Sequence, residues 1–163
     1  MSKNAPTIRV SIKQQTLSLL DGSTVIKTYA VCTAKNGVGE ENGSECTPLG
    51  KHTIRAKIGA NAAAGSVFVG RRLTGEVYSQ QLVDKNPNRD WILTRIMWLS
   101  GLEVGKNRLG SVDTMRRYIY IHGAPEHLVT QQPSSHGCIR MLNEDVMDLF
   151  TRVPVGTTVL IEN

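Results

Sequence analysis

Alternation of apolar and polar residues predicts short β-strands along most of the chain. Residues 7–12 alternate cleanly, so that Ile8 and Val10 are expected on one face. Residues 16–20 and 24–31 flank Asp21-Gly22, a pair typical of a two-residue hairpin turn. We therefore expect the chain to open with three short strands in an antiparallel meander.

The same kind of pattern returns later in the chain, separated by polar or glycine-rich segments. Residues 91–99 are strongly apolar and residues 84–90 read as a polar turn. The other expected strands are 52–58, 67–69, 76–82, 115–122 and 157–161, of which 67–69 and 76–82 are the weakest. The glycine-rich segments 34–46 and 59–66 are candidates for lids over a site.

Helical spacing is convincing only after residue 142. Asn143 suits a helix N-cap, and Val146, Leu149 and Phe150 repeat on one apolar face. Pro154 then ends the segment. The sequence predicts one mostly β domain over residues 1–163, with one clear short helix.

Composition supports a globular domain and narrows its partners. Of the 163 residues, 40% are apolar and 20% charged, and the net charge is +5. The basic residues are scattered, so we expect no nucleic acid and favour an anionic small substrate. No apolar run suits a secretory leader or a membrane span, which predicts a cytoplasmic protein without a membrane partner, or a periplasmic one if a leader has been removed.

Three cysteines, an odd number, indicate free thiols. Cys32 lies in an apolar run and is expected to be a buried small hydrophobic residue. Cys46 lies in a polar loop and no role is assigned to it. Cys138 is different, because three of the four histidines lie near it in sequence.

A cysteine nucleophile needs a base that makes the thiolate and donors for an oxyanion. Three histidines compete as the base: His136 two residues away, His122 at the end of a predicted strand, and His127 in the intervening loop. Gly137 allows close approach of a substrate, and the amides of Gly137 and Cys138 could form an oxyanion hole.

Other interpretations of these residues remain open. The histidines and Cys138 could bind zinc, but their spacings match no structural zinc pattern, and we expect no metal. Cys138 could also be merely buried in a binding loop. Arg95, in the middle of an apolar strand, either pairs with a buried carboxylate or points into a site.

The run from His122 to Ser135-His136-Gly137-Cys138 resembles the signature of the YkuD-type L,D-transpeptidase catalytic domain. The Asp21-Gly22 meander, the turn at 47–50 and the run RYIYIHG resemble the same domain, over roughly residues 7–162. The resemblance implies a β-rich, sandwich-like fold in which a mixed sheet carries the cysteine near a helix start. No cofactor is implied.

The resemblance also implies roles for individual residues. Cys138 would be the nucleophile and His122 the general base, oriented by the backbone carbonyl of Gly123. The residues expected to shape the oxyanion site are Ser135, His136 and Gly137, and those expected to bind substrate are Arg140, Tyr120 and Arg95. A guanidinium such as that of Arg140 suits a substrate carboxylate.

The implied substrate is a peptidoglycan tetrapeptide, free or in a muropeptide, cleaved between diaminopimelate and D-alanine through a thioester. A carbapenem could form a covalent adduct at Cys138. Because no leader is seen, we favour an L,D-carboxypeptidase of murein recycling, in which water takes the acyl group. The alternatives are an L,D-transpeptidase that forms 3→3 cross-links or exchanges the terminal D-amino acid, and a catalytically silent binding module.

Overall fold

The computed structural model describes residues 5–163, and the described residues form ten strands and two α-helices. In chain order the elements are β1 (Pro6–Ser11), β2 (Thr16–Asp21), β3 (Thr24–Cys32), β4 (Gly50–Ile58), β5 (Ser66–Val69), β6 (Arg72–Val77), α1 (Gln80–Lys85), β7 (Ile92–Gly101), η1 (Gly110–Val112), β8 (Tyr120–Ala124), η2 (Glu126–Leu128), β9 (Ile139–Leu142), α2 (Asn143–Arg152) and β10 (Thr158–Glu162). The two η elements are single 3₁₀ turns. The predicted mostly β fold is confirmed.

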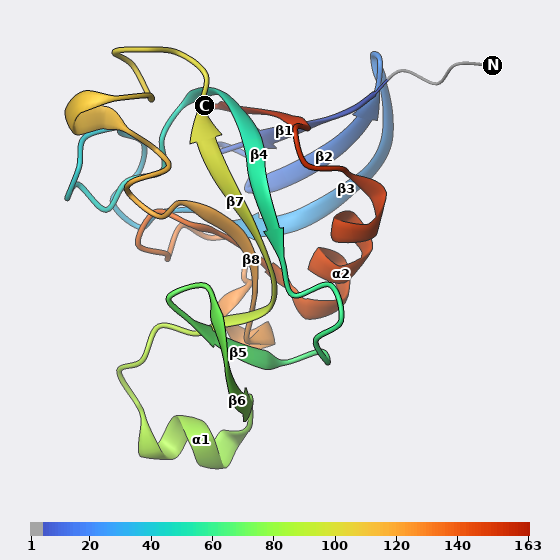
Figure 1. Cartoon of the computed structure of the whole chain (residues 1–163), viewed down its shortest axis with the longest axis vertical. Coiled ribbons are helices and arrows are strands. Elements are labelled where there is room, and N and C mark those ends of the chain that lie inside the picture. The colour runs from blue at the N-terminus through green and yellow to red at the C-terminus, as the bar shows by residue number, and fades with distance from the viewer. Residues whose placement is uncertain (1–4) are drawn as a thin grey trace.

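The strands make one mixed sheet in the order β4-β10-β1-β2-β3-β9-β8-β7-β5-β6. The opening meander β1-β2-β3 is confirmed. The pairs β1–β10 and β8–β9 are parallel, and the other pairs are antiparallel. Because β4 also pairs with β7, eight strands close into a ring, and the β5–β6 hairpin and α1 lie outside it at the bottom of Figure 1.

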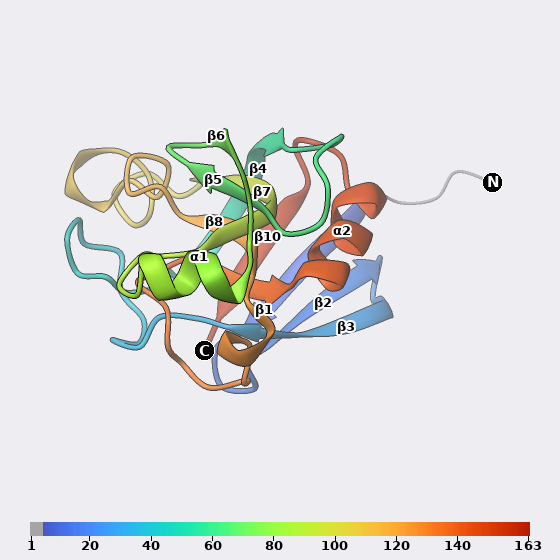
Figure 2. The same cartoon turned by 90° about the horizontal axis from the view of Figure 1, so that it is seen from below.

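Alternation along the central strands separates two apolar clusters. Met97 and Ile121 belong to the main core, onto which α2 lays its apolar face against β7, β8 and β9. Ile96 and Tyr120, one position away on the same strands, belong to a smaller cluster with Phe68 of β5. Figure 2 shows α2 and the β5–β6 hairpin on different sides of these strands. The site is built on the side of the smaller cluster.

The segment 72–90 differs from its prediction. The weak strand expected at 76–82 ends as β6 at Val77, and α1 follows it. α1 begins where it does because the side chain of Ser79 accepts a hydrogen bond from the amide of Leu82, which satisfies an otherwise free donor of the first turn. Within residues 5–163, neither this helix nor α2 is long and apolar enough to cross a membrane.

The segment 115–143 is also divided differently. The strand expected at 115–122 starts only at Tyr120, since the preceding residues form turns and Tyr118 has a left-handed φ of 56°. The short strand β9 was not expected. The helix that follows it is confirmed, but its N-cap is Leu142, while the Asn143 side chain accepts a hydrogen bond from Thr94 Oγ1 at 2.6 Å.

Candidate active site

The parallel pairing of β8 with β9 brings the candidate chemistry onto one face of the sheet. Ile121 lies opposite Ile139, and His122 lies opposite Arg140. Because side chains alternate along a strand, the two isoleucines enter the main core and the other pair points to the opposite face. Cys138, immediately before β9, shares that face with Arg140.

His122 is buried, and its ring is oriented by the next residue. Its Nδ1 lies 2.7 Å from the carbonyl oxygen of Gly123. A carbonyl can only accept, so Nδ1 carries the proton and Nε2 keeps its lone pair. Burial lowers the pKa of His122, against the raising effect of the Gly123 carbonyl. The ring is therefore neutral near neutral pH, in the form that a general base needs.

Cys138 is half-buried and held against the backbone of the chain just before and at the start of β8. Its sulfur accepts a hydrogen bond from the amide of Tyr120 at 3.3 Å and donates one to the carbonyl of Tyr118 at 3.4 Å. Burial raises the pKa of the Cys138 thiol, although the Tyr120 amide lowers it in part. The thiol therefore stays protonated near neutral pH, and a base has to generate the thiolate.

The turn before Cys138 is held by its own hydrogen bonds. Ser135 Oγ donates to the carbonyl of Cys138 at 2.6 Å and accepts from the amide of Gly137 at 3.2 Å. Gly137 has a φ of 129°, which residues with a side chain rarely adopt. Its carbonyl accepts a hydrogen bond from Thr47 Oγ1 at 2.9 Å. Because the Gly137 amide is engaged within this turn, its oxyanion role stays a prediction.

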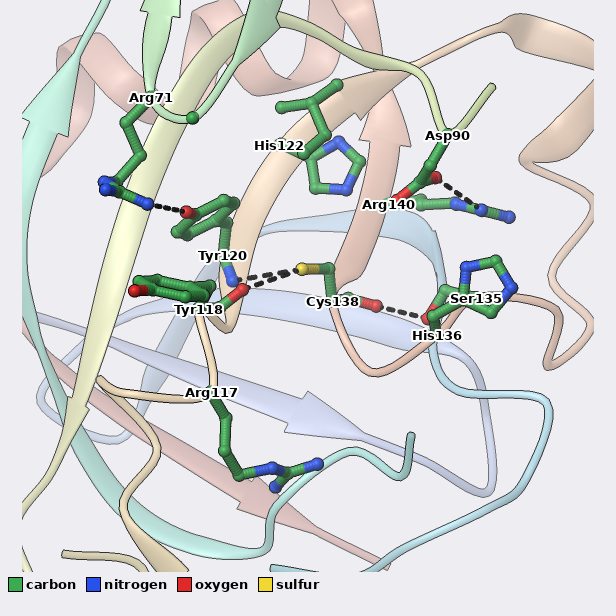
Figure 3. Close-up of a pocket in the computed structure, with 12 residues that line it drawn as sticks. Arg71, Asp90, Arg117, Tyr118, Tyr120, His122, Ser135, His136, Cys138 and Arg140 are labelled. Atoms are coloured by element: carbon green, nitrogen blue, oxygen red, sulfur yellow. Dashed lines mark hydrogen bonds and ion pairs between the residues drawn. The ribbon is translucent and has the colours of Figure 1, made fainter. Parts of the chain in front are cut away.

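A pocket of about 430 Å³ opens over Cys138 and His122 (Figure 3). Its walls come from the β5–β6 hairpin, the segment before β7, the turn before β8, and the 135–140 segment. The lining residues are Gly70, Arg71, Asp90, Ile92, Arg117, Tyr118, Tyr120, His122, Ser135, His136, Cys138 and Arg140. Three arginines against one aspartate make the lining cationic, as an anionic substrate requires.

Arg140 lies in this pocket, but its charge is already balanced. The side chain is 8% exposed and forms an ion pair with Asp90 at 3.2 Å, and it also donates to the carbonyl of Ser134 at 3.3 Å. Asp90 itself is 47% exposed. A substrate carboxylate would have to compete with Asp90, so the predicted role of Arg140 as a free carboxylate ligand finds no support in its contacts.

The substrate-binding role expected for Arg95 is wrong. Its guanidinium donates to the carbonyls of Ala62 at 2.8 Å and Thr94 at 2.6 Å, and it lies against the ring of Phe150 on α2. It points there because Arg95 alternates with Ile96, which faces the smaller cluster on the pocket side. Its contacts are structural, but its partners are backbone carbonyls and not the buried carboxylate that the sequence suggested as the alternative.

Two arginines of the pocket were not foreseen. Arg117 donates to the carbonyls of Gly39 at 3.3 Å and Cys46 at 2.6 Å, which fixes the 34–46 segment to the turn before β8. Burial lowers its pKa. Arg71 reaches the pocket from the tip of the β5–β6 hairpin. The glycine before Arg71 was the available signal for that turn, but no local pattern connects the hairpin to Cys138.

The remaining histidines and cysteines are placed as follows. His136 lines the pocket but is exposed, and His127 lies outside it in η2. Across residues 5–163, no three His, Cys, Asp or Glu side chains converge as a metal ion requires. All three cysteines are free thiols, as predicted, and Cys32 is fully buried.

Comparisons with known proteins give a match to a family model and to one short stretch of a curated relative. The family model for YkuD, the L,D-transpeptidase catalytic domain, matches residues 5–161. A curated relative from Escherichia coli K12, named "Probable L,D-transpeptidase YbiS", is 46% identical over 43 residues, which are 26% of this chain and 14% of that protein.

Solved L,D-transpeptidases share the fold at low sequence identity. The enzyme from Xylanimonas cellulosilytica is 17% identical with a TM-score of 0.54, covering 99% of this chain and 62% of that one. L,D-transpeptidase 3 from Mycobacterium tuberculosis, in complex with a faropenem-derived adduct, is 16% identical with a TM-score of 0.60, covering 98% and 60%. This chain thus spans about 60% of these solved relatives. The family match over nearly its whole length means that the chain belongs to the YkuD family of L,D-transpeptidase catalytic domains.

Proposed function

We propose that the chain is a cysteine acyltransferase that acts on the stem peptide of peptidoglycan. One observation carries the proposal: the free thiol of Cys138 shares a cationic pocket with His122, whose Nε2 is left unprotonated by the bond from Nδ1 to Gly123. This is the combination of nucleophile, base and orienting group that acyl transfer requires. The family match supports it.

The proposed donor is a tetrapeptide attacked at the carbonyl between diaminopimelate and D-alanine. The Cys138 sulfur bonds to that carbonyl carbon while His122 Nε2 takes the thiol proton. The C–N bond then breaks, the proton passes from His122 to the leaving nitrogen, and D-alanine departs. A thioester between the peptide and Cys138 remains, and the thiol is regenerated when an acceptor attacks it.

The acceptor determines the final reaction. The hydrolytic outcome predicted from the sequence, an L,D-carboxypeptidase of murein recycling in the cytoplasm, remains our proposal for the product. The relatives named as L,D-transpeptidases favour the second candidate, in which an amine replaces water and a 3→3 cross-link or an exchanged D-amino acid results. The faropenem-derived adduct of a relative supports covalent capture of a β-lactam at Cys138, and we propose that a carbapenem forms such an adduct there.

Mass spectrometry of the products tests the proposal. Purified protein is incubated with a soluble tetrapeptide, with and without a second stem peptide as acceptor. Tripeptide and D-alanine as main products in both cases support hydrolysis, and a predominant dimer supports transpeptidation. The Cys138→Ala variant should form neither product. If the wild type forms no product and no adduct with a carbapenem, the chain is a binding module and the proposal is wrong.

A further inference from the structure

Arg71 lies in a well-defined turn at the tip of the β5–β6 hairpin. Val69 pairs with Arg72, so Gly70 and Arg71 form a two-residue turn. Their φ values, 56° and 66°, are both left-handed, as in the type I′ turns that join tightly twisted strands. A left-handed arginine is unusual, because its Cβ disfavours this conformation. The hairpin therefore presents a long cationic side chain at a turn position where glycine or asparagine is more common.

The guanidinium of Arg71 is fixed over the floor of the pocket. One of its terminal nitrogens donates to the hydroxyl of Tyr120 at 3.0 Å. Its central carbon lies 4.7 Å from the ring centre of Tyr118 and 4.8 Å from that of Trp98. Stacking on aromatic rings orients a guanidinium without using its other donors. Figure 3 shows the side chain reaching from the hairpin to the two tyrosines.

These tyrosines connect Arg71 to the nucleophile. The amide of Tyr120 and the carbonyl of Tyr118 are the two backbone groups that contact the sulfur of Cys138. The guanidinium is thus anchored by the side chains of the same two residues that position the thiol. A group bonded to Arg71 would lie on the side of Cys138 that faces the hairpin.

Arg71 differs in one respect from the other two arginines of the pocket. Arg140 is paired with the carboxylate of Asp90, and Arg117 is occupied by backbone carbonyls of the 34–46 segment. Within residues 5–163, Arg71 forms no ion pair, and its one hydrogen bond goes to a neutral hydroxyl. Of the three arginines of the pocket, Arg71 is therefore the one best able to bind an anionic group of a ligand.

We propose that Arg71 is a specificity residue that binds the terminal carboxylate of the peptide substrate, so that the pocket selects peptides that end directly after the scissile bond. This inference rests on the proposed function. In such a peptide only a nitrogen and one Cα separate the attacked carbonyl from the terminal carboxylate. The carboxylate of a bound peptide therefore stays within the pocket that Arg71 and Cys138 both line, and the guanidinium offers donors that suit a carboxylate.

The test compares a tetrapeptide that ends in D-alanine with the same peptide that ends in D-alaninamide. The wild type, Arg71→Met and Arg71→Lys are assayed for release of the terminal residue. Arg72→Met is the matched control, because Arg72 carries the same charge on the same hairpin but is exposed and does not line the pocket. Binding of both peptides is measured calorimetrically in the Cys138→Ala background, with and without Arg71→Met.

We expect the wild type to prefer the acid over the amide at least tenfold in kcat/KM, the size of one charge-assisted hydrogen-bonded contact. Arg71→Met should lower kcat/KM for the acid about tenfold or more and change kcat/KM for the amide by less than about twofold. Arg71→Lys should keep part of the preference for the acid, and Arg72→Met should keep all of it. If Arg71 had a purely structural role, Arg71→Met would lower kcat/KM equally for both substrates, and that result would overturn the inference.

The two readouts separate this inference from the proposed function. Turnover of acid and amide at equal rates would refute the role of Arg71 and leave the acyl transfer intact. Absence of turnover, with binding that still prefers the acid through Arg71, would refute the proposed reaction and support the carboxylate site. If the wild type turns over neither peptide and the Cys138→Ala protein binds neither, both are wrong.

Discussion

A buried histidine, His52, anchors the turn that carries Arg117 and Tyr118 into the pocket, and lowering the pH tests this anchor. His52 of β4 is fully buried, and its Nδ1 donates to the carbonyl of Gly50 at 3.0 Å. Its Nε2 accepts from the hydroxyl of Thr114 at 3.1 Å, at the start of that turn. Burial lowers the pKa of His52 from 6.5 to about 4. The neutral ring is therefore part of the folded structure.

This shift fixes the sign and size of a pH effect. Because the pKa is lower in the folded state, the unfolded chain takes up the proton first as the pH falls below 6.5, and stability is lost. The two pKa values give a loss of about 2 kcal/mol between pH 7 and pH 5, and about 3 kcal/mol by pH 4. Burial lowers the pKa of His122 as well, which adds to the loss in the same direction.

Urea unfolding at pH 7 and pH 5 measures the effect in the wild type, His52→Gln and the control His127→Gln. Glutamine cannot be protonated, so His52→Gln should be less stable at pH 7 yet lose about 2 kcal/mol less than the wild type on acidification. His127 is exposed, and its variant should follow the wild type. If His52→Gln loses as much as the wild type between the two pH values, the buried neutral His52 is not the cause.

Three further outcomes follow from the site. Gly123→Ala should cost about 2 kcal/mol or more in urea unfolding and abolish turnover, because the new Cβ would lie 2.6 Å from the carbonyl oxygen of Leu93. The rate at which iodoacetamide alkylates Cys138, followed by mass spectrometry, should be lower than that of free cysteine near pH 7.5 and should rise only above pH 9, because burial raises the pKa of the Cys138 thiol. Fast alkylation of Cys138 at neutral pH would contradict the protonated thiol. Ser135→Ala should lower the free energy of unfolding by about 2 kcal/mol and slow carbapenem acylation, whereas Ser134→Ala, which removes a buried hydroxyl without a partner among residues 5–163, should be neutral or stabilising.

Local patterns predicted the parts of the fold that depend on local chemistry. The opening meander followed from alternation and from the Asp21-Gly22 turn, and α2 followed from helical spacing. A strand that carries His122 was predicted for the same reason, but His122 lies in the middle of β8 and not at its end. The ring closure through β4 and β7 could not, because pairing between residues about 45 positions apart leaves no short-range signal.

The contacts of Arg95 and Arg140 depend on features that the local sequence pattern does not encode. The pairing of β7 with β8 shifts register between Leu93 and Ile96, and Thr94 has a left-handed φ of 73°. Arg95 therefore lies on the side of the sheet that α2 covers, and the apolar composition of its strand could not predict which side it would face. The pairing of Arg140 with Asp90 was not predicted, because Asp90 lies 50 positions earlier, in a segment that reads only as a polar turn.

The charges around Cys138 and His122 explain how an inert thiol can serve a reaction. Arg140 favours the thiolate and disfavours the imidazolium, and its partner Asp90 has the opposite effect on each. Burial is then the dominant influence, and it favours the neutral thiol and the neutral ring. Transfer of the proton from the Cys138 thiol to the His122 ring is therefore unfavourable by itself. In the proposed reaction it becomes favourable when the sulfur bonds to a carbonyl carbon as the proton leaves, so we expect Cys138 to react more slowly with small reagents than with a bound acyl donor.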